Sequence, residues 1–495
     1  MSSARAILRL AVAVSVLISS SAMAVVAWGY GGGGGGSTSC SGSPTTTAFQ
    51  AALPIMSSLA PSSTDATTDY YTLPGITMKS GSISILPGFL TAIWGYNGTT
   101  PGPTIKVAPG RKAVIKQTNS LGENTSVHLH GGHTPSNANN ALGDDGGPVA
   151  YIAHDGGSHT YSYPNNQVAA TLWYHDHAMD ITGPHVYKGL AGFYLLSDQN
   201  EQSLNLPSGI YDVPLVIQDK TFNTDGSLCY QLDSSTIRQG FQGDTVLVNG
   251  AVQPYFKVEP RQYRLRFLNG SESSRYELSL SNGAPLIQIA SDGGLLQAPV
   301  SRSSALLAPA EREEFLIDFS KYPGQSIVLN NSQGWGSRNT GQIMRFDVAN
   351  TTPVPGTVPS KLATIAKIDP ATAAVTRSWK LSQNNGTWVI NDKAFDPKRI
   401  DAQPKLGTVE VWQFQNQSGE YHPIHIHDME WQVVSEDGSP PPAWDAGWKD
   451  VFLVKPWSSY SVVTKFTDNT GVYVFHCHNL EHEDHAMMGQ FQVMP

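Results

Sequence analysis

One strand pattern occurs three times in this chain and limits the folds that are available to it. The copies are "RKAVIKQTNS" (111–120), "RQYRLRFLNGS" (261–271) and "GTVEVWQFQNQS" (407–418). Each alternates apolar and polar residues, which is typical of a β-strand with one buried face. Each copy also carries an Asn near its end, and these residues stand at nearly equal intervals, at Asn119, Asn269 and Asn416.

A second strand follows each copy at nearly the same distance. It begins with Gly and reads "GFYLL" from Gly192, "GQIMRF" from Gly341 and "GQFQV" from Gly489. Chance similarity between strands is a poor explanation for two patterns that recur together at matched offsets. A repeat of this kind indicates one structural unit present three times.

Length and composition agree with three β-domains. A chain of 495 residues is too long for one ordinary core. It contains 47 Gly and 32 Pro and only 14% charged residues, and its short Val-, Ile-, Thr- and Tyr-rich runs favour an all-β fold over a helical one. The predicted domains span residues 68–200, 210–350 and 370–495, with polar, Pro-containing linkers near 197–209 and 349–361.

The N-terminus predicts export. Two Arg residues precede an apolar stretch that ends in a small-residue cleavage pattern at Ala24, so residues 1–24 are expected to be a signal peptide. The alternative is an uncleaved anchor, because apolar residues continue to Trp28. Residues 25–67 are rich in Gly, Ser and Thr and are expected to be flexible. We therefore expect a secreted or periplasmic protein with no stable membrane insertion after cleavage.

Charge and cysteine content restrict the partners. The formal net charge is −9 and no run of basic residues occurs, so nucleic acid is not an expected partner. The chain has three cysteines. If Cys477 has another role, Cys40 and Cys229 would either form a disulfide in an oxidising compartment or remain free thiols.

Histidine placement indicates the chemistry. Ten of the 15 His fall in four short clusters, two in the first repeat, two in the third and none in the second. These clusters are "HLHG" (His128, His130), "WYHDH" (His175, His177), "HPIHIH" (His422, His425, His427) and "HCHNLEH" (His476, His478, His482). Residues i and i+2 of a strand face the same side, so each His-x-His presents two imidazoles together. Four such pairs in two repeats predict a shared metal site.

Cys477 lies between His476 and His478, and its thiol is expected to face the opposite side of the strand. Alignment of Gly192 with Gly489 places Asp176 roughly opposite Cys477, so the first repeat would lack this second metal position.

The expected nitrogen donors beside Cys477 are His422 and His482. Met487 is the expected weak sulfur donor, with Met488 as the alternative. One thiolate, two imidazoles and a distant thioether are typical of a blue-copper electron-transfer site.

These motifs resemble those of the multicopper oxidases, the laccase and bilirubin oxidase family, and "HCHNLEHEDHAMM" is most similar to bacterial laccases of the spore-coat type. The resemblance runs from about residue 70 to the end of the chain. It implies three consecutive cupredoxin-like Greek-key β-barrel domains. It also implies four copper ions per chain: one type 1 copper in the third domain, and one type 2 and two type 3 coppers between the first and third.

The resemblance assigns ligand positions residue by residue. His422, Cys477, His482 and Met487 match the type 1 ligands, and His128 and His425 match the type 2 ligands. The type 3 positions are matched by His130, His175, His177, His427, His476 and His478. Five His match no ligand position and are expected to lie at the surface or behind the metal ligands: His133, His154, His159, His185 and His485.

The implied activity is the oxidation of phenolic or other aromatic substrates, one electron at a time, coupled to reduction of dioxygen to two waters. We expect the protein to be a monomer. An accessible ligand, His482 or His422, would take electrons from the substrate. The alternatives are a bilirubin-oxidase-like pigment oxidase or a metallo-oxidase for Mn(II), Fe(II) or Cu(I). The chain has ten Met and no Met-rich insertion near the type 1 motifs, which weakens the Cu(I) alternative.

Two carboxylates are expected to supply protons to the oxygen-reducing site. Glu483 matches a family carboxylate near the type 3 coppers. The second family position falls at Asn139, which cannot relay a proton, and Asp145 is interpreted as its displaced equivalent, with Asp144 as the alternative. A purely turn-forming role for both aspartates is the competing hypothesis.

Overall fold

The computed structural model describes residues 40–136, 143–335 and 340–495. The predicted signal peptide, the first part of the predicted flexible segment and Asn139 lie outside these residues. Within the described residues, no helix has the length and apolar character needed to cross a bilayer.

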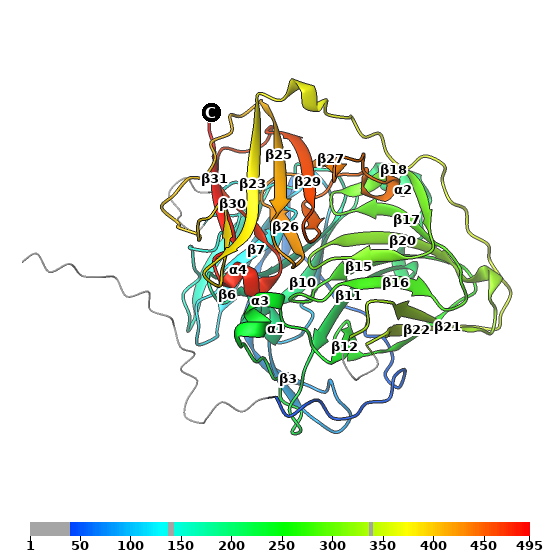
Figure 1. Ribbon diagram of the computed structural model, residues 1–495. Helices are drawn as coiled ribbons and strands as arrows, with labels where there is room; N and C mark the ends of the chain where they lie inside the picture. Colours follow the sequence, from blue (N-terminus) through cyan, green and yellow to red (C-terminus); the bar gives the residue numbers. More distant parts are fainter. Residues whose placement is uncertain (1–39, 137–142, 336–339) are drawn as a thin grey trace, which may run out of the picture. The chain divides into compact units, whose positions relative to one another are not determined.

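Each third of the chain forms two β-sheets of its own, so that six sheets occur in three consecutive pairs (Figure 1). We call these pairs the first, second and third repeat. The sheets of the first repeat are β1(Ser58–Leu59)-β5(Thr104–Val107)-β10(Ala191–Leu196)-β9(Thr171–Asp176)-β7(Val127–His130) and β2(Ser63–Thr64)-β3(Thr68–Ile83)-β6(Lys112–Asn119)-β8(Gly157–Tyr163), with β4(Thr91–Tyr96) paired to β3.

The second and third repeats have the same two-sheet plan. The sheets of the second repeat are β13(Ala251–Val252)-β12(Thr245–Val248)-β11(Asp212–Lys220)-β15(Gln262–Asn269)-β20(Arg312–Asp318)-β17(Leu286–Ser291)-β18(Gly294–Arg302) and β14(Tyr255–Val258)-β22(Gln342–Val348)-β21(Ser326–Asn331)-β16(Tyr276–Leu280)-β19(Ala305–Leu307). The sheets of the third repeat are β24(Thr387–Ile390)-β23(Val375–Asn384)-β25(Val409–Asn416)-β29(Ser459–Lys465)-β27(Gln432–Glu436) and β28(Val451–Val454)-β26(His422–Ile426)-β30(Gly471–Cys477)-β31(Met488–Val493).

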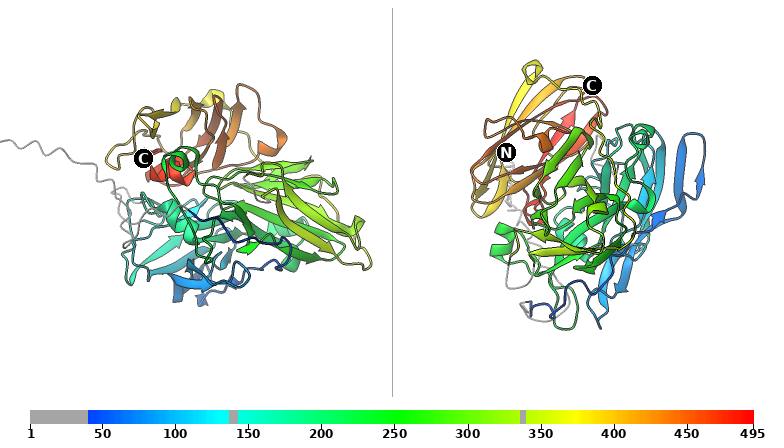
Figure 2. Two further views of the ribbon diagram at one scale, coloured as in Figure 1. Left: turned by 60° about the horizontal axis from the view of Figure 1, so that its bottom comes forward. Right: turned by 90° about the vertical axis from the view of Figure 1, so that its right-hand side faces the viewer.

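Helical segments are few and short. They are α1(Thr182–Lys188), α2(Gln199–Ser203), α3(Ser234–Gln239) and α4(Leu480–Asp484), with 3₁₀ turns at η1(Gly209–Tyr211), η2(Phe319–Lys321), η3(Pro370–Thr372) and η4(Ala443–Asp445). Helix α4 packs against α1 and α3, and the views of Figures 1 and 2 show these helices side by side. One helix from each repeat therefore meets at this point. The prediction of an all-β chain is confirmed.

Each repeat encloses its own apolar core between its two sheets. The first core includes Ile115 and Tyr161, the second Phe267 and Phe315, and the third Trp412. Sheets pack in pairs because each strand has one apolar face that must be buried.

The repeated Asn explains why the strand pattern recurs. Asn269 ends β15, and its Nδ2 donates to the carbonyl oxygens of Ser274 (2.7 Å) and Leu307 (3.0 Å). Its Oδ1 accepts from the backbone amide of Ser271 at 3.0 Å. Asn119 and Asn416 end β6 and β25 and make the corresponding three kinds of bond. This side chain therefore replaces strand partners where the chain leaves the sheet.

The prediction of a flexible segment up to residue 67 is wrong from Cys40 onward. Cys40 forms a disulfide with Cys229, which settles the pairing that the sequence left open. Leu53 donates its amide to the carbonyl of Tyr255 (2.8 Å), and its side chain joins the core of the second repeat. The covalent link and these contacts outweigh a composition that is otherwise typical of a tether.

Replacement of the repeated Asn in the second repeat should destabilise the fold without touching the His clusters. We expect Asn269→Ala to lower the free energy of unfolding by about 2–3 kcal/mol, because two carbonyls and one amide lose a buried partner. Urea unfolding measures this loss, and the exposed Asn350→Ala serves as control. Equal stability of the two variants would contradict this account of the repeat.

Candidate metal centre

The His-x-His pairs lie on four strands, and in three of them the second His is the first residue past the strand end. In the first repeat β7 pairs antiparallel with β9, which places His128 opposite His175. In the third repeat β26 pairs antiparallel with β30, which places His425 opposite His476. Alternation along each strand then sends both imidazoles of a pair to the same face. The first and third repeats therefore each present a group of buried imidazoles on one face of a sheet.

The imidazoles of the first and third repeats meet. His128 stacks on His427 with ring centroids 3.8 Å apart, and His130 stacks on His425 at 3.6 Å. The residues of this group, here called the histidine cluster, are all buried: His128, His130, His175, His177, His425, His427, His476 and His478. Residues separated by about 300 positions in the sequence thus share one interior site.

Ring nitrogens in the cluster face one another without a proton to share. His128 Nδ1 donates to the carbonyl oxygen of Asp145 (2.8 Å), and His425 Nδ1 donates to the carbonyl oxygen of Asp450 (2.9 Å). A carbonyl only accepts, so each neutral ring carries its proton on Nδ1 and a lone pair on Nε2. The two Nε2 atoms lie 3.3 Å apart. Two lone pairs at this distance repel unless a cation lies between them, and this donor set therefore fits a metal ion.

The same arrangement occurs at a second position in the cluster. His427 Nε2 lies 3.2 Å from His177 Nε2 and 3.4 Å from His476 Nε2. Carboxylates lie behind these rings: Asp145 Oδ2 is 3.0 Å from His427 Nδ1, and Glu483 is 3.0 Å from Nδ1 of both His177 and His476. Carboxylates at this side of a ring fix the tautomer that leaves Nε2 free for a metal.

Further ring nitrogens in the cluster lack any partner within the described residues. They are His130 Nδ1, His175 Nε2 and both ring nitrogens of His478. A buried nitrogen without a partner costs free energy, and a bound metal ion would remove that cost. Burial, together with the neighbouring rings, lowers the pKa of His128 and His425 well below the ordinary value. The rings of His128 and His425 are therefore neutral, which is the form that binds metals.

A second donor group lies on the opposite face of β30, as the sequence predicts for Cys477. Cys477 Sγ is 3.5 Å from Nδ1 of His422 and 3.5 Å from Nδ1 of His482, and these two nitrogens are 3.2 Å apart. Burial raises the pKa of the Cys477 thiol. The thiol would remain protonated in the absence of metal, so metal binding must displace that proton.

Both His of this thiolate site are sealed from solvent. His482 Nε2 donates to the carbonyl oxygen of Arg238 in α3 (2.9 Å), and His422 Nε2 lies 3.0 Å from the hydroxyl of Ser418. Both rings are 0% exposed. The expectation of an accessible His ligand is therefore wrong, because backbone and side chains of other loops cover both remote nitrogens.

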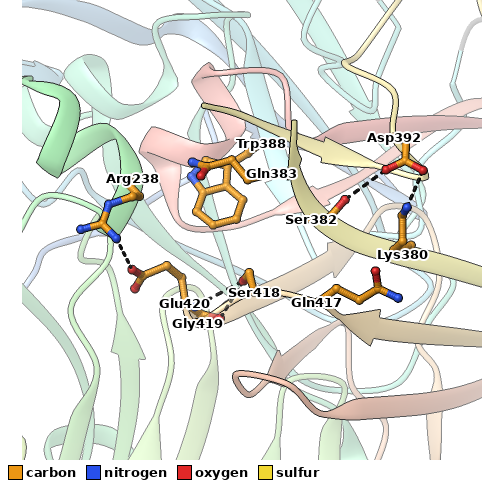
Figure 3. A pocket seen from close by; sticks show the side chains of 10 residues that line it. All are labelled: Arg238, Lys380, Ser382, Gln383, Trp388, Asp392, Gln417, Ser418, Gly419 and Glu420. Atoms are coloured by element: carbon orange, nitrogen blue, oxygen red, sulfur yellow. Dashed lines mark hydrogen bonds and ion pairs between the residues drawn. The ribbon is translucent and has the colours of Figure 1, made fainter. Parts of the chain in front are cut away.

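A cavity of about 450 Å³ adjoins the thiolate site (Figure 3). Its lining includes Trp388, whose ring lies 4.8 Å from that of His422 and 4.5 Å from that of His482. Ser418 and Arg238 also line it. The three groups that cover the thiolate site are therefore the floor of an open cavity. No pattern in the sequence indicates this role of Trp388, because the contact depends on how separate loops fold together.

The position in the first repeat that corresponds to Cys477 holds hydrogen bonds in place of metal donors. The Asp176 carboxylate accepts from the backbone amides of Ser126 (2.9 Å) and Ala178 (3.1 Å). It also contacts His185 Nδ1 at 2.8 Å. The absence of a second metal position from the first repeat stays a prediction. His185, which matches no ligand position, is a buried partner of Asp176.

Asp450 contacts the histidine cluster, and the sequence analysis assigned it no role. Its Oδ1 accepts from His130 Nε2 (3.1 Å) and from Arg312 Nη1 (2.6 Å). Asp450 thus orients His130 and His425 together, and Arg312 of the second repeat holds Asp450 in place. Asp450 ends the segment "GWKD" (447–450), which has none of the His or Cys spacing on which the site predictions relied.

His133 joins the first repeat to the third beside the cluster. Its ring contacts Glu430 through Nε2 and Asp468 through Nδ1. Burial alone would lower the pKa of His133, but the two carboxylates raise it well above the ordinary value. Two carboxylates from the third repeat therefore hold a protonated imidazole from the first.

This contact should make stability depend on pH. The folded pKa of His133 is raised above the unfolded value of about 6.5, so its contribution is complete below that pH and is lost as pH rises through the folded pKa. We expect the unfolding temperature to fall more steeply above pH 6.5 in the native protein than in His133→Gln, with the exposed His154→Gln as control. Parallel pH profiles for all three proteins would contradict the role of His133.

Comparisons with known proteins agree with these two sites. Residues 77–201 and 366–495 each match a multicopper oxidase family domain. A laccase from Bacillus stratosphericus is 38% identical over 472 residues, which cover 82% of this chain and 91% of the relative. A bilirubin oxidase from Albifimbria verrucaria is 37% identical over 422 residues, which cover 80% of this chain and 72% of the relative.

The fold agrees as well. The crystal structure of a laccase from Pediococcus acidilactici aligns with a TM-score of 0.82 at 33% identity, covering 92% of this chain and 95% of that one. The three repeats are accordingly cupredoxin-like domains, as the resemblance implied. Sequence similarity over most of the chain and the shared fold together show that this protein belongs to the multicopper oxidase family of copper-dependent oxidoreductases.

Proposed function

We propose that this protein is a laccase-like oxidase that takes single electrons from phenolic or other aromatic substrates and reduces dioxygen to two waters. The observation that carries the proposal is the segment His476–Cys477–His478. Its thiol belongs to one donor group and its two imidazoles belong to the other. A short covalent path thus joins a site suited to one-electron transfer and a site with enough donors for several metal ions.

The proposed copper ligands follow the two donor groups. The type 1 site would be held by His422, Cys477, His482 and Met487, and the trinuclear site by His128, His130, His175, His177, His425, His427, His476 and His478. Copper bound there would supply one-electron oxidation at the thiolate and oxygen reduction at the histidine cluster, with four ions per chain.

Met487 is favoured over Met488 as the weak sulfur donor. Met487 is fully buried and belongs to the same core cluster as Cys477, between the sheets of the third repeat. Met488 pairs with His476 in the ladder between β30 and β31. Consecutive residues of a strand face opposite sides, so only one of the two can approach the thiolate.

The cavity of Figure 3 is the proposed substrate site. Its floor touches both thiolate-site imidazoles through Trp388, and an aromatic ring there would contact another aromatic ring. Two ion pairs line its walls, Arg238 with Glu420 and Lys380 with Asp392. Both carboxylates of the cavity are thus already paired with a cationic side chain. The lining residues of the cavity include no Met or His. This chemistry supports organic reductants over metal ions.

Bilirubin-like pigments and metal ions remain the alternative substrates, and a direct screen separates them. Copper-loaded protein would be assayed for oxygen uptake with phenols, bilirubin, Mn(II), Fe(II) and Cu(I). We expect phenols to give the highest kcat/KM. An electron carrier without oxidase activity would need only the Cys477 group, and it would leave eight converging His without a purpose. A copper-free interaction module would not be expected to keep a complete donor set.

Export belongs to the same proposal. The Cys40–Cys229 disulfide supports a secreted or periplasmic location, because such bonds persist in oxidising compartments. The predicted signal peptide would direct that export, and the protein is expected to act as a monomer.

Asp145 and Glu483 are the proposed proton-handling groups. Glu483 lies between His177 and His476, and Asp145 Oδ2 lies 3.0 Å from His427 Nδ1. Burial raises the pKa of Asp145 to about 8, so this carboxyl can hold a proton at neutral pH. Asp144 is directed elsewhere, because its carboxylate accepts from the backbone amide of Ser162 at 2.7 Å. This geometry favours Asp145 over Asp144.

Replacement of the thiolate should separate the two sites. We expect Cys477→Ser to lose the intense blue absorption and the oxidation of phenols, yet to bind roughly three coppers through the remaining imidazoles. Copper analysis and visible spectroscopy measure both effects. The double variant Cys40→Ser, Cys229→Ser is the control and should keep the colour. Phenol oxidation at the native rate in Cys477→Ser would refute the proposed electron path.

Replacement of the proposed proton donor should affect only the oxygen half of the reaction. We expect Asp145→Asn to keep its copper and its anaerobic bleaching by phenol, while the reaction of the reduced protein with oxygen slows at least about tenfold. Asp144→Asn makes the same substitution one residue away and should react normally. Stopped-flow absorbance follows both half-reactions. Equal slowing in the two variants, or no slowing in Asp145→Asn, would count against the relay.

A further inference from the structure

A second cavity, of about 410 Å³, lies between the second and third repeats. It shares no lining residue with the cavity beside Cys477. The second repeat supplies parts of β16, β18, β19 and β20, and the third supplies parts of β27, η4, β28 and β29. The activity proposed above makes no use of this cavity.

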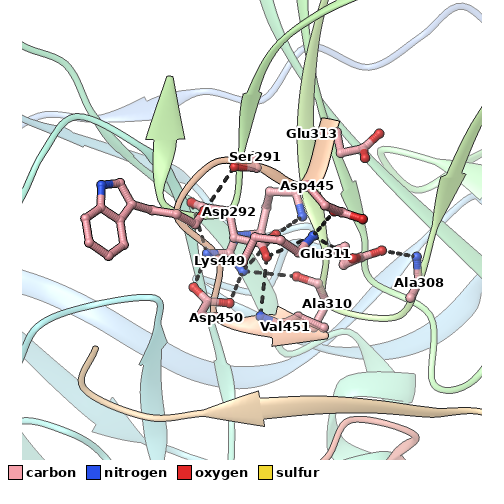
Figure 4. A network of polar contacts seen from close by, with 12 residues as sticks. Ser291, Asp292, Ala308, Ala310, Glu311, Glu313, Asp445, Lys449, Asp450 and Val451 are labelled. Atoms are coloured by element: carbon pink, nitrogen blue, oxygen red, sulfur yellow. Dashed lines mark hydrogen bonds and ion pairs between the residues drawn. The ribbon is translucent and has the colours of Figure 1, made fainter. Parts of the chain in front are cut away.

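The lining of this cavity is rich in carboxylates. The acidic residues are Glu277, Glu311, Glu313, Glu436 and Asp445, and the basic residues are Arg302 and Lys455. Lys449 is buried beside them and reaches Glu311 (2.9 Å) and Asp445 (3.1 Å), as Figure 4 shows. Even with Lys449 included, acidic side chains outnumber basic ones.

Two carboxylate oxygens in this lining lack a partner within the described residues. Glu313 Oε1 pairs with Arg302 Nη1 at 2.9 Å, whereas Glu313 Oε2 contacts no donor. The Glu313 side chain is only 4% exposed. In Figure 4 its carboxylate points away from the Lys449 contacts. Glu436 Oε1, in the third repeat, also lacks a donor in the part of the chain that the structure describes.

A buried carboxylate oxygen without a donor is a favourable position for binding a cation. An unpaired carboxylate oxygen away from water costs free energy, which a positively charged donor would recover. Burial raises the pKa of Glu313 to about 8, although Arg302 opposes this shift. Without a cationic ligand the carboxyl therefore holds a proton at neutral pH, and a bound cation would replace that proton.

The shape of the lining distinguishes between kinds of cation. In the described residues, every set of three metal-donor atoms within 4.8 Å of one another belongs to the copper sites described above, so these carboxylates form no compact metal cage. The lining also includes Trp444, Tyr460, Leu453 and Pro442. Spaced carboxylates beside aromatic and aliphatic surface suit an ammonium group on a carbon skeleton.

We propose that this cavity binds a small organic cation with a primary ammonium group, held by Glu313 from the second repeat and Glu436 from the third. Arg302 fixes one oxygen of Glu313 and stacks on Trp444, with its guanidinium carbon 4.9 Å from a ring centroid. The other oxygen is left for the ligand. A cation held by both repeats would stabilise the folded protein in proportion to its occupancy.

The test measures the binding of 1,4-diaminobutane to the copper-loaded full chain by isothermal titration calorimetry at constant ionic strength. We expect one saturable site in the native protein, and no binding of the neutral analogue 1,4-butanediol. Glu313→Gln should weaken the affinity about tenfold or more, because it removes the charged acceptor of the ammonium group.

Glu277→Gln is the matched control. Glu277 lines the same cavity, but its oxygens already accept from the hydroxyls of Ser304 (2.9 Å) and Ser332 (2.8 Å). Glu277→Gln removes a carboxylate from the same cavity, so a loss of general attraction would weaken binding in this variant as well. We expect the affinity of Glu277→Gln to stay within about twofold of the native value, since the charge change alone is screened by salt.

Three results would overturn the proposal. They are the absence of saturable binding, equal weakening in Glu313→Gln and Glu277→Gln, or tighter binding of Mg²⁺ than of the diamine. If Glu313→Gln does not fold, Glu436→Gln takes its place, and native affinity in that variant would also overturn the proposal. The measurement does not depend on oxidase activity, so failure of the proposed substrate would leave this result unaffected.

Discussion

The facing ring nitrogens of the histidine cluster are the contact on which the arrangement of the three repeats depends. His128 and His425 come from different repeats, and their Nε2 lone pairs lie 3.3 Å apart. Such a contact is unfavourable in itself and persists only if both rings are held rigidly from behind. Carbonyl oxygens of Asp145 and Asp450 hold them, and Arg312 of the second repeat holds Asp450 in turn. The second repeat has no His in the cluster, yet it fixes the distance between the two repeats that do.

Burial makes the same residues suited to copper. The interior position keeps the imidazoles of His128 and His425 neutral and the Cys477 thiol protonated, so a metal ion meets lone pairs or displaces a single proton. The opposite faces of β30 then carry different metal donors. Imidazoles of His476 and His478 point to the cluster, while Cys477 points into the core of the third repeat with Met487. Strand alternation, which is a local property, thus places two chemically different sites back to back.

Local patterns in the sequence predicted what depends on alternation and spacing. The repeated strands were confirmed as β6, β15 and β25, each ending at its predicted Asn. The pairs His128–His130 and His425–His427 were placed correctly on one face, because a period of two residues fixes this without knowledge of the fold. Contacts between distant loops carry no such signal. For that reason the sealing of His482 by the Arg238 carbonyl was missed, and so was the packing of residues 40–67 on the second repeat.

The disulfide gives the first repeat a particular kind of attachment. Cys40 precedes every strand of that repeat, and Cys229 follows all of them, so the bond closes a ring of chain that contains half of the histidine cluster. If the first repeat opens locally, both of its ends stay fastened to the second, and its imidazoles remain at high effective concentration near their partners. In a reducing environment the disulfide would be broken, and this ring of chain would be open. The cellular compartment would thus affect how readily the proposed copper cluster reassembles, through a bond far in the sequence from any proposed copper ligand.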